Sequence, residues 1–308
     1  QQFAVSCILR SIKAIQSAQE PPQHEDFCKA LANFFAQQAE ADPAYVAEMM
    51  ILPPETYLAE LMTPIDVDAI YQARKLLQAA IAEKLEASLL SCVQQHMKTS
   101  RNKSYDYNAV EMGQRRLVAV CLSYLCVLDK AQYHQLAADY FAAANNMTAS
   151  MSALDALNDV DCDQRQQTLD SFAQRWQGDT LVMDKWFSLQ ARARTADALQ
   201  VVQGLMQHPA FAMTNPNKVR ALIGSFSMAN PTTFHAKDGS GYRFLADQVI
   251  ALNAINPQVA ARLLKPLISW HKYDSQRQAL MCTELRRIHD TEGLSSDVFE
   301  LVDRGLAQ

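Results

Sequence analysis

The run TNPNKVRALIG, residues 214–224, decides the fold because it joins a helix start to an apolar stripe. An asparagine just before a helix can accept a hydrogen bond from a free amide of the first turn, and a proline at the first helical position lacks an amide that would be unpaired anyway. Apolar residues follow at helical spacing, at Val219, Leu222, Ile223 and Phe226. The run therefore predicts an amphipathic helix that begins at Pro216.

The same Asn-Pro step occurs twice more, at residues 230–231 and 256–257. The last of these opens NPQVAARLL, residues 256–264, which repeats the apolar spacing of the first run. Between the two steps lies FHAKDGSGY, residues 234–242, whose polar residues and two glycines are typical of a turn between helices. We interpret Ser240 in this turn as the N-cap of the next helix.

Helical spacing of apolar residues extends over most of the remaining chain, and no segment shows the alternation of strands joined by hairpin turns. Glycine is scarce, with eight in 308 residues, which argues against a protein rich in tight turns. The run 66–98 contains neither glycine nor proline and predicts one long helix or two in close succession. The other predicted helices cover residues 5–15, 27–42, 45–52, 110–128, 130–143, 163–177, 195–207, 274–291 and 295–306. Two more carry Met151, Leu154 and Leu157 in one case and Met183, Trp186 and Phe187 in the other, the latter capped by Asp179 or Thr180.

These helices are too numerous to share the core of one bundle, so we expect an all-α solenoid in which antiparallel helix pairs stack on one another. The sequence shows no regular period, which indicates an irregular, HEAT-like superhelix rather than a consensus repeat. We expect residues 1–308 to form a single helical domain.

Composition excludes several classes of partner. The net charge of −5 disfavours nucleic acid, because binding to phosphates requires a clustered positive face. The most apolar run, residues 117–128, is too short for a bilayer, which needs about 20 apolar residues, so no membrane span is predicted. Seven cysteines without a Cys-x-x-Cys motif suggest neither a disulfide framework nor a zinc ribbon. We therefore expect reduced thiols in a cytoplasmic protein.

Each candidate motif for catalysis or metal binding has a simpler structural explanation. His24 to Cys28 resembles His-Glu-x-x-His, but a cysteine replaces the second histidine, and the first turn of a helix is favoured over a zinc site. Ser269 to Lys272 matches Ser-x-x-Lys without the triplet that would support an acyl enzyme. Residues 239–241, GSG, fit neither a phosphate loop nor a nucleophile elbow. The sequence predicts no catalytic residue and no metal ligand in this chain.

Arg220 and Arg262 are the strongest candidates for a binding role. Each lies beside apolar positions on its own predicted helix, where a half-buried arginine needs an acceptor. The simpler alternative is that each one pairs with an internal acid such as Asp184 or Asp238, or bonds to the end of a helix. The two alternatives stay open at this stage.

Together with LVMDKWF, residues 181–187, these runs resemble the C-terminal helical domain of the bacterial aminopeptidase N family of zinc metallopeptidases. The resemblance extends along the chain and is densest over residues 144–273. It implies a non-catalytic C-terminal domain of a larger enzyme that removes N-terminal residues from short peptides. The zinc motif of the family is absent here, and the chain begins with Gln1, so we expect the catalytic zinc domain to lie before residue 1.

The resemblance also implies a substrate contact. In the family, two arginines at the places of Arg220 and Arg262, with a glutamine at the place of Gln258, face the catalytic cavity and contact the peptide beyond the scissile bond. Gln258 and Arg262 are four residues apart and so share one helix face. Glutamine can bond a peptide group, and arginine can bond a carboxylate bidentately.

The resemblance therefore implies a domain that caps the active-site chamber and restricts access to short chains. We expect no cofactor in this chain and zinc in the rest of the enzyme. The expected partners are the N-terminal catalytic domains of the same chain and short peptides, within a monomer. The alternative is a free-standing helical scaffold that binds a protein through its concave face. A His-Glu-x-x-His motif and a downstream Glu in the reading frame before Gln1 would decide between them.

Overall fold

The computed structural model describes residues 2–100 and 104–307, and within them it is built from helices. The only β pairing in this part of the chain is an isolated bridge between Ile65 and Tyr273. None of the described helices is long and apolar enough to cross a membrane. The all-α prediction is confirmed.

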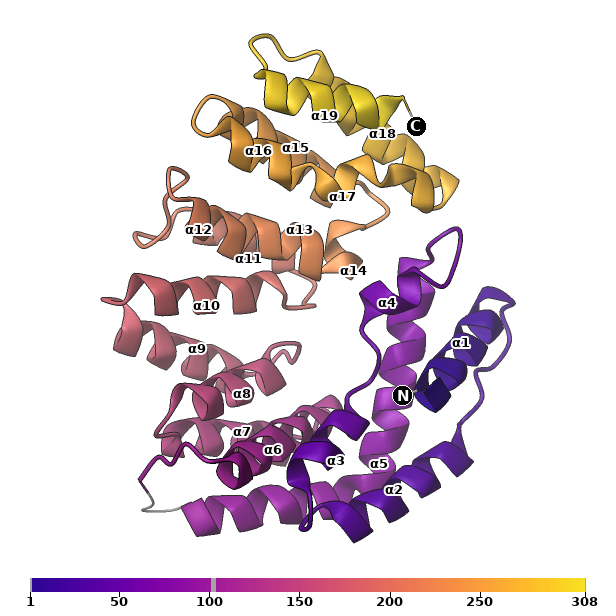
Figure 1. Cartoon of the computed structure of the whole chain (residues 1–308), viewed down its shortest axis with the longest axis vertical. Helices are drawn as coiled ribbons and strands as arrows, with labels where there is room; N and C mark the ends of the chain where they lie inside the picture. Colours follow the sequence, from indigo (N-terminus) through magenta and orange to yellow (C-terminus); the bar gives the residue numbers. More distant parts are fainter. Residues whose placement is uncertain (1, 101–103, 308) are drawn as a thin grey trace. The chain divides into compact units, whose positions relative to one another are not determined.

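The chain divides into two compact units, the first of which comprises Gln1–Leu58 and Asp68–Ser171. Its helices are α1 (Gln2–Gln16), α2 (Glu25–Gln38), α3 (Pro43–Met50), α4 (Glu55–Ala59), α5 (Val67–Ser100), α6 (Ala109–Val127), α7 (Ala131–Ala143), α8 (Met147–Leu157) and most of α9 (Asp163–Trp176), whose last five residues belong to the second unit. The run without glycine or proline forms the single 34-residue helix α5, so one long helix is the correct alternative (Figure 1).

Consecutive helices of the first unit pack on one another. Helix α6 contacts α3, α7 and α8, and α7 contacts α8. Gly113 of α6 allows the close approach of α3, because a Cβ atom there would lie 3.1 Å from the Cβ of Ala44. The hydroxyl of Tyr124 donates to the carbonyl of Met50 over 2.6 Å and ties the same two helices together. These contacts form the stacking of helices that a solenoid requires.

The second unit comprises Ala59–Val67 and Phe172–Gln308. Its elements are α10 (Thr180–Ala191), α11 (Ala198–Leu205), α12 (Pro216–Val219), a π-helical turn η1 (Arg220–Gly224), α13 (Ser225–Ala229), α14 (Pro231–Phe234), α15 (Ser240–Asn253), α16 (Pro257–Leu263), α17 (Lys265–Ile268), a 3₁₀ turn η2 (Trp270–Lys272), α18 (Ser275–His289) and α19 (Ser296–Leu306).

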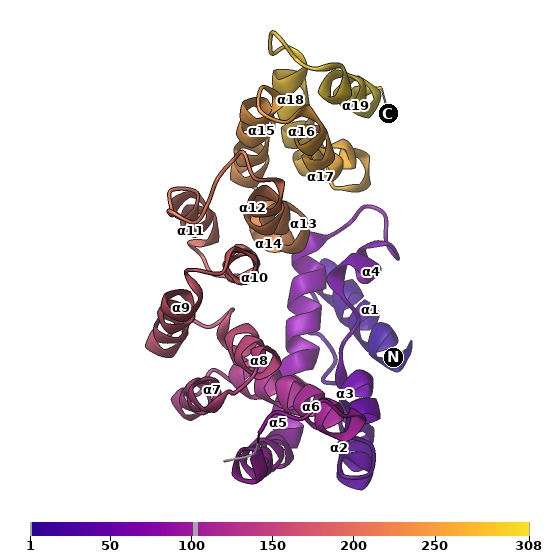
Figure 2. The same cartoon turned by 60° about the vertical axis from the view of Figure 1, so that its left-hand side comes forward.

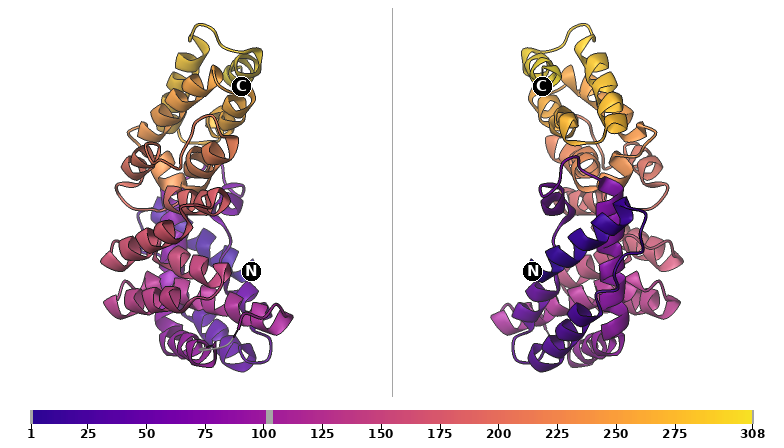
Figure 3. Two further views of the ribbon diagram at one scale, coloured as in Figure 1. Left: turned by 90° about the vertical axis from the view of Figure 1, so that its left-hand side faces the viewer. Right: turned by 90° about the vertical axis from the view of Figure 1, so that its right-hand side faces the viewer.

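The helices of the second unit form successive layers (Figures 1 and 2). Helix α10 packs on η1 and α11, α15 packs on α16 and α18, and α16 and α18 pack on α19. The antiparallel pair α18 and α19 is seen side by side in yellow in Figure 3. Element lengths vary from layer to layer, which confirms an irregular solenoid of stacked helices.

The apolar stripe predicted after Pro216 forms the centre of the second unit. Its four members are fully buried, namely Val219, Leu222, Ile223 and Phe226. Phe234 adds an edge-on contact to the ring of Phe226, with 6.1 Å between ring centroids, and another to Tyr242 at 5.3 Å. The three Asn-Pro steps all begin helices, as predicted.

Two details of this region differ from the prediction. Asn230 is fully buried and does not cap α14 with its side chain; its Nδ2 instead donates to the carbonyls of Ala191 and Ala193, over 3.1 and 2.7 Å. Ser240 is the first residue of α15 and not its N-cap. Asp238 accepts from the amide and the hydroxyl of Ser240, and Gly239 occupies the cap position with φ of 71°. The aspartate has taken the role expected of the serine.

Two further expectations concern the number of domains and the state of the cysteines. A solenoid can contain more than one compact unit, so the single domain over residues 1–308 stays a prediction. The seven cysteines are free thiols, and four of them are buried.

Candidate functional site

The segment that carries Arg220 begins as the sequence predicts and then departs from it. Asn215 Oδ1 accepts a hydrogen bond from the amide of Asn217 over 2.9 Å, and Pro216 opens α12. After one turn the α-helical pattern widens into the π turn η1, in which the amide of Ser225 donates to the carbonyl of Arg220. Single π turns inside helices are frequent at functional sites.

Contacts with neighbouring helices accompany the wide turn. The hydroxyls of Ser225 and Ser188 of α10 lie 2.8 Å apart and are hydrogen-bonded. A Cβ atom on Gly224 would lie 3.8 Å from the side chain of Leu263, so the turn also lies against α16. Apolar spacing alone cannot show such a turn, because the stripe on either side of it stays buried.

The side chain of Arg220 is exposed and is held by its own helix. Its Nε donates to the carbonyl of Pro216 over 3.3 Å, and its Nη2 donates to Asn217 Oδ1 over 2.6 Å. It forms no ion pair with Asp184 or Asp238, the two acids considered as its partners. Asp184 pairs with Lys218, and Asp238 bonds Ser240. The guanidinium of Arg220 therefore keeps its charge at the surface without a carboxylate partner among the described residues.

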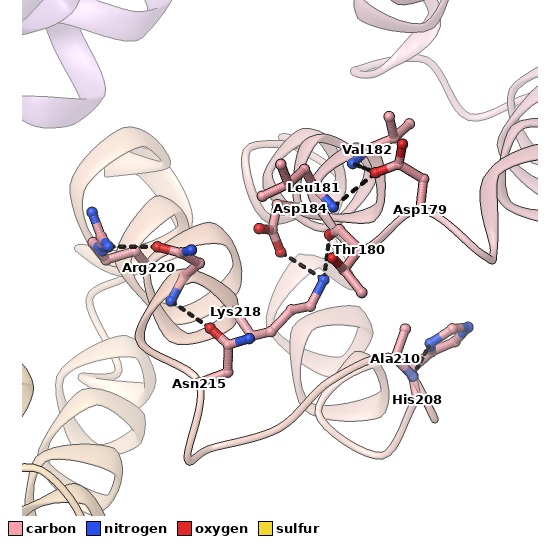
Figure 4. Close-up of polar contacts among 11 residues, drawn as sticks. Asp179, Thr180, Leu181, Val182, Asp184, His208, Ala210, Asn215, Lys218 and Arg220 are labelled. Carbon is pink, nitrogen blue, oxygen red and sulfur yellow. Dashed lines mark hydrogen bonds and ion pairs between the residues drawn. The ribbon is translucent and has the colours of Figure 1, made fainter.

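Lys218 is a residue that the sequence reasoning missed. It is 3% exposed, and its Nζ lies 2.8 Å from Asp184 Oδ1 and donates to the carbonyl of Thr180 over 2.6 Å. The same ammonium lies 5.5 Å from the centroid of the Phe187 ring, within cation–π range. Figure 4 shows Lys218 directed towards Thr180 and Asp184 while Arg220 points away from them. The pair ties α12 to α10.

Helix α10 presents a well-formed first turn to this lysine. Asp179 Oδ1 accepts from the amides of Leu181 and Val182, both over 3.0 Å (Figure 4), so Asp179 rather than Thr180 caps the helix. Asp184, which follows in the next turn of the helix, indicates in the sequence that a basic residue could pair with it. The sequence does not show that this residue is Lys218.

Gln258 and Arg262 lie on the short helix α16. Asn256 Oδ1 accepts from the amide of Val259 over 3.1 Å, which fixes the helix start at Pro257. Both side chains are exposed, and neither has a hydrogen bond or ion pair within the part of the chain that the structure describes. Arg262 is thus not the half-buried residue that its apolar neighbours indicated, because those neighbours turn inward while it turns to solvent.

This arrangement offers hydrogen-bond donors and positive charge to a ligand. Arg262 presents a planar fork of N–H groups that matches a carboxylate, and Gln258 can both donate and accept one turn away. The contact between Gly224 and Leu263 makes the helices that carry Arg220 and Arg262 neighbours. Residues 2–100 and 104–307 contain no group of three or more His, Cys, Asp or Glu side chains that could hold a metal ion. We therefore assign no zinc ligand to them.

The zinc-like motif near the N-terminus has ordinary partners. His24 Nε2 and the hydroxyl of Ser11 are hydrogen-bonded over 2.8 Å, and burial lowers the pKa of this histidine. Cys28 is buried, and burial raises the pKa of its thiol. The hydrogen bond between Ser11 and His24 connects α1 to the start of α2.

Comparisons with known proteins agree on one family. The family described as "Domain of unknown function (DUF3458_C) ARM repeats" matches residues 1–307. Aminopeptidase N of Escherichia coli (strain K12) is 38% identical over 86% of this chain and 30% of its own length. Aminopeptidase N of Haemophilus influenzae is 40% identical over 87% of this chain and 30% of its own length. Aminopeptidase N of Caulobacter vibrioides is 36% identical over 92% of this chain and 32% of its own length.

A solved structure gives the same relationship. The crystal structure of Legionella pneumophila aminopeptidase A in complex with aspartic acid superposes with a TM-score of 0.86 at 30% identity, over 99% of this chain and 36% of that one. The chain thus spans about a third of the length of the relatives it matches.

Proposed function

Since the chain belongs to the DUF3458_C family of ARM-repeat domains and is similar to the C-terminal region of aminopeptidase N, we propose that it is the non-catalytic C-terminal domain of a zinc-dependent aminopeptidase. The enzyme would remove N-terminal amino acids from short peptides, with its zinc held by a separate domain of the same chain. This domain would cap the active-site chamber and admit short, unfolded chains. We place the enzyme in the cytoplasm as a monomer.

The observation that carries the proposal is the exposure of three donor side chains on neighbouring helices. Arg220, Gln258 and Arg262 all reach solvent, and neither arginine has a carboxylate partner among the described residues. These side chains can therefore accept a ligand without breaking an internal ion pair.

A short peptide supplies the matching groups. Its C-terminal carboxylate can receive two parallel hydrogen bonds from Arg262, and its last peptide group can bond to Gln258. An amino-acid anilide offers no carboxylate beyond the scissile bond. The proposal therefore predicts discrimination between these two kinds of substrate.

The test uses the full-length protein that contains this chain. Arg262→Ala removes a charge-assisted contact of about 1.5–3 kcal/mol, so kcat/KM for a tripeptide should fall by roughly ten- to a hundred-and-fifty-fold. The value for an alanine anilide should stay within about twofold of wild type, because that substrate makes no such contact. Arg220→Ala should act in the same direction with a smaller effect, because this guanidinium already bonds Asn217.

Arg286→Ala on α18 is the matched control, because Arg286 is also an exposed arginine of the second unit. It should leave both substrates unchanged. If Arg262→Ala lowers both activities equally and also lowers the unfolding temperature, Arg262 has a structural role and the proposed contact is wrong.

A further inference from the structure

A cavity of about 680 Å³ lies within the first unit, distant in sequence from Arg220 and Arg262. It is bordered by the end of α5, the segment 104–106, α6, α7 and the start of α8. Its polar wall includes His96, Asp106, Glu111, Arg115, Asp139 and Tyr140. Sites for small molecules typically have volumes of about 300–1,000 Å³, so an amino acid or a short peptide fits this space.

Arg115 supplies a buried positive charge to this cavity. It is 7% exposed, and its Nη2 donates to the carbonyl of Asp106 over 3.2 Å while its guanidinium lies 4.9 Å from the ring centroid of Tyr105. The structure records no carboxylate partner for it among residues 2–100 and 104–307. Buried charges are normally paired, and a guanidinium carries five N–H donors. Arg115 therefore retains donors for an anionic group.

Tyr140 adds a second unused donor. It is 5% exposed, and its hydroxyl is buried without a hydrogen-bond partner in the described part of the chain. Burial raises the pKa of Tyr140 to about 12, although the nearby charge of Arg115 acts in the opposite direction. The hydroxyl stays protonated near neutral pH and can donate. A buried polar group without a partner is uncommon in a folded protein and requires an explanation.

The start of α8 contributes to the same wall. Asn146 Oδ1 accepts from the amide of Ala149 over 2.9 Å and caps this 11-residue helix, and both residues line the cavity. The positive pole of a helix N-terminus favours a negative group. Together with Arg115 and Tyr140, it makes the cavity suited to a carboxylate.

The cavity also carries carboxylates of its own. Asp106 accepts from Asn108 over 2.6 Å, Asp139 accepts from Gln135 over 2.8 Å, and Glu111 lies on the same wall. Lys98 also lines the cavity, so three acidic residues stand against two basic ones, and the carboxylates would repel a dianion such as phosphate. They would attract an ammonium group, so the wall as a whole is suited to a molecule that bears both charges.

We propose that this cavity binds a small zwitterion, a free α-amino acid or a dipeptide, whose carboxylate accepts from Arg115 and Tyr140 and whose ammonium faces the carboxylates of the wall. This inference does not depend on the proposed function, because it rests on residues of the first unit alone. It assigns a role to a buried cation and a buried hydroxyl that the substrate contacts at Arg262 do not use.

Isothermal titration of the 308-residue chain tests it with five probes. Alanine and Ala-Ala carry both charges, acetate carries the carboxylate alone, alaninamide carries the ammonium alone, and inorganic phosphate is a plain anion. At least one of the two zwitterions should bind saturably, about tenfold or more tightly than the other three probes. Comparison of the affinities for alanine and for Ala-Ala then shows whether the cavity prefers an amino acid or a dipeptide. The same binding must persist in Arg262→Ala, which separates this cavity from the site of the proposed function.

Tyr140→Phe is the decisive variant, because it keeps the ring and removes only the unpaired hydroxyl. The free protein should be no less stable, since no hydrogen bond is lost. Affinity for the zwitterion should fall by about tenfold or more, as expected for a hydrogen bond to a charged group. Tyr124→Phe is the matched control, because the hydroxyl of Tyr124 bonds to Met50; it should lower stability and leave affinity unchanged.

Three results would overturn the inference. In the first, none of the five probes binds below about 10 mM, although pockets of this kind ordinarily bind their ligands more tightly. In the second, acetate or phosphate binds as tightly as alanine and Ala-Ala, which indicates a plain anion site. In the third, Tyr140→Phe leaves the affinity for the zwitterion unchanged, which places the binding elsewhere in the chain.

Discussion

Replacement of Lys218 by methionine is the perturbation that most directly tests how the second unit holds Arg220. The methionine keeps the apolar stem and removes the ammonium that contacts Asp184 Oδ1 and the carbonyl of Thr180. The side chain of Lys218 is 4% exposed, and that of Asp184 is 18% exposed. The variant therefore leaves a largely buried carboxylate with no cation beside it.

Removing one partner of a buried ion pair typically costs about 3–5 kcal/mol, mainly because the remaining charge stays desolvated. Asp184 keeps some access to water, so we expect a loss near the lower end, about 3 kcal/mol. The double variant Lys218→Met with Asp184→Leu removes both charges and should come within about 1 kcal/mol of wild type, since apolar replacements of buried pairs are often neutral or better. Lys265→Met, at an exposed lysine of α17, is the matched control and should change stability by no more than about 0.5 kcal/mol.

Urea unfolding followed by tryptophan fluorescence is the suitable assay. The three tryptophans, Trp176, Trp186 and Trp270, all belong to the second unit, so the signal reports on the unit that contains the pair. A loss below about 1 kcal/mol for Lys218→Met would mean that water reaches the pair and that it contributes little. A double variant as unstable as the sum of the two single variants would show that the two side chains do not interact.

Two further substitutions test neighbouring features of the second unit. Gly241→Ala would place a Cβ atom 2.3 Å from the carbonyl oxygen of Phe234, a backbone atom that cannot move aside, so stability should fall by about 3 kcal/mol or more. Gly204→Ala in α11, where no atom lies within 4 Å of the added Cβ, should instead raise stability by up to about 1 kcal/mol. If the two glycine variants change the free energy of urea unfolding equally, the close approach at Gly241 is contradicted. Asn230→Ala should cost about 2–4 kcal/mol, because it removes two buried hydrogen bonds, whereas Asn256→Ala removes a helix cap worth about 1 kcal/mol. If the two asparagine variants have the same unfolding midpoint, the two buried hydrogen bonds of Asn230 stabilise the protein no more than a helix cap does.

Local signals in the sequence predicted most of the fold. Asparagine followed by proline marks a helix start because both residues act on amides of the first turn, and these contacts need no information from the rest of the chain. The prediction of a helix from the absence of glycine and proline over residues 66–98 likewise depends only on local backbone preferences. The structure has the single helix α5 there. Of the two failed cap predictions, that of Ser240 was decided locally by Asp238, and that of Asn230 was decided by a contact distant in sequence. Asn230 bonds to Ala191 and Ala193, which are nearly forty residues away.

The candidate sites were predictable to different degrees. The sequence indicated Arg220, Gln258 and Arg262, but their exposure became clear only from the structure, because apolar neighbours suggested partial burial. Arg115 and Tyr140 gave no signal, since neither belongs to a motif and each lies within an ordinary helix. Their significance depends on a missing partner, and a missing partner can be recognised only when every neighbour is known.

Lys218 and Arg220 show why a residue pattern can predict a helix without predicting which side chains of that helix contact its neighbours. They are two positions apart, which on a helix separates their side chains by about 200°, so if one is buried the other must face outward. Helix α12 has only four residues before the π turn, and it can form few hydrogen bonds of its own. Its orientation is therefore set by the buried apolar stripe together with the contacts of Lys218 with Thr180 and Asp184 of α10. Apolar residues in place of both Lys218 and Asp184 could fill the same space with similar stability, but they would lack the directional contact that selects one orientation. The outward direction of Arg220 is thus determined by α10 as much as by the run in which it lies.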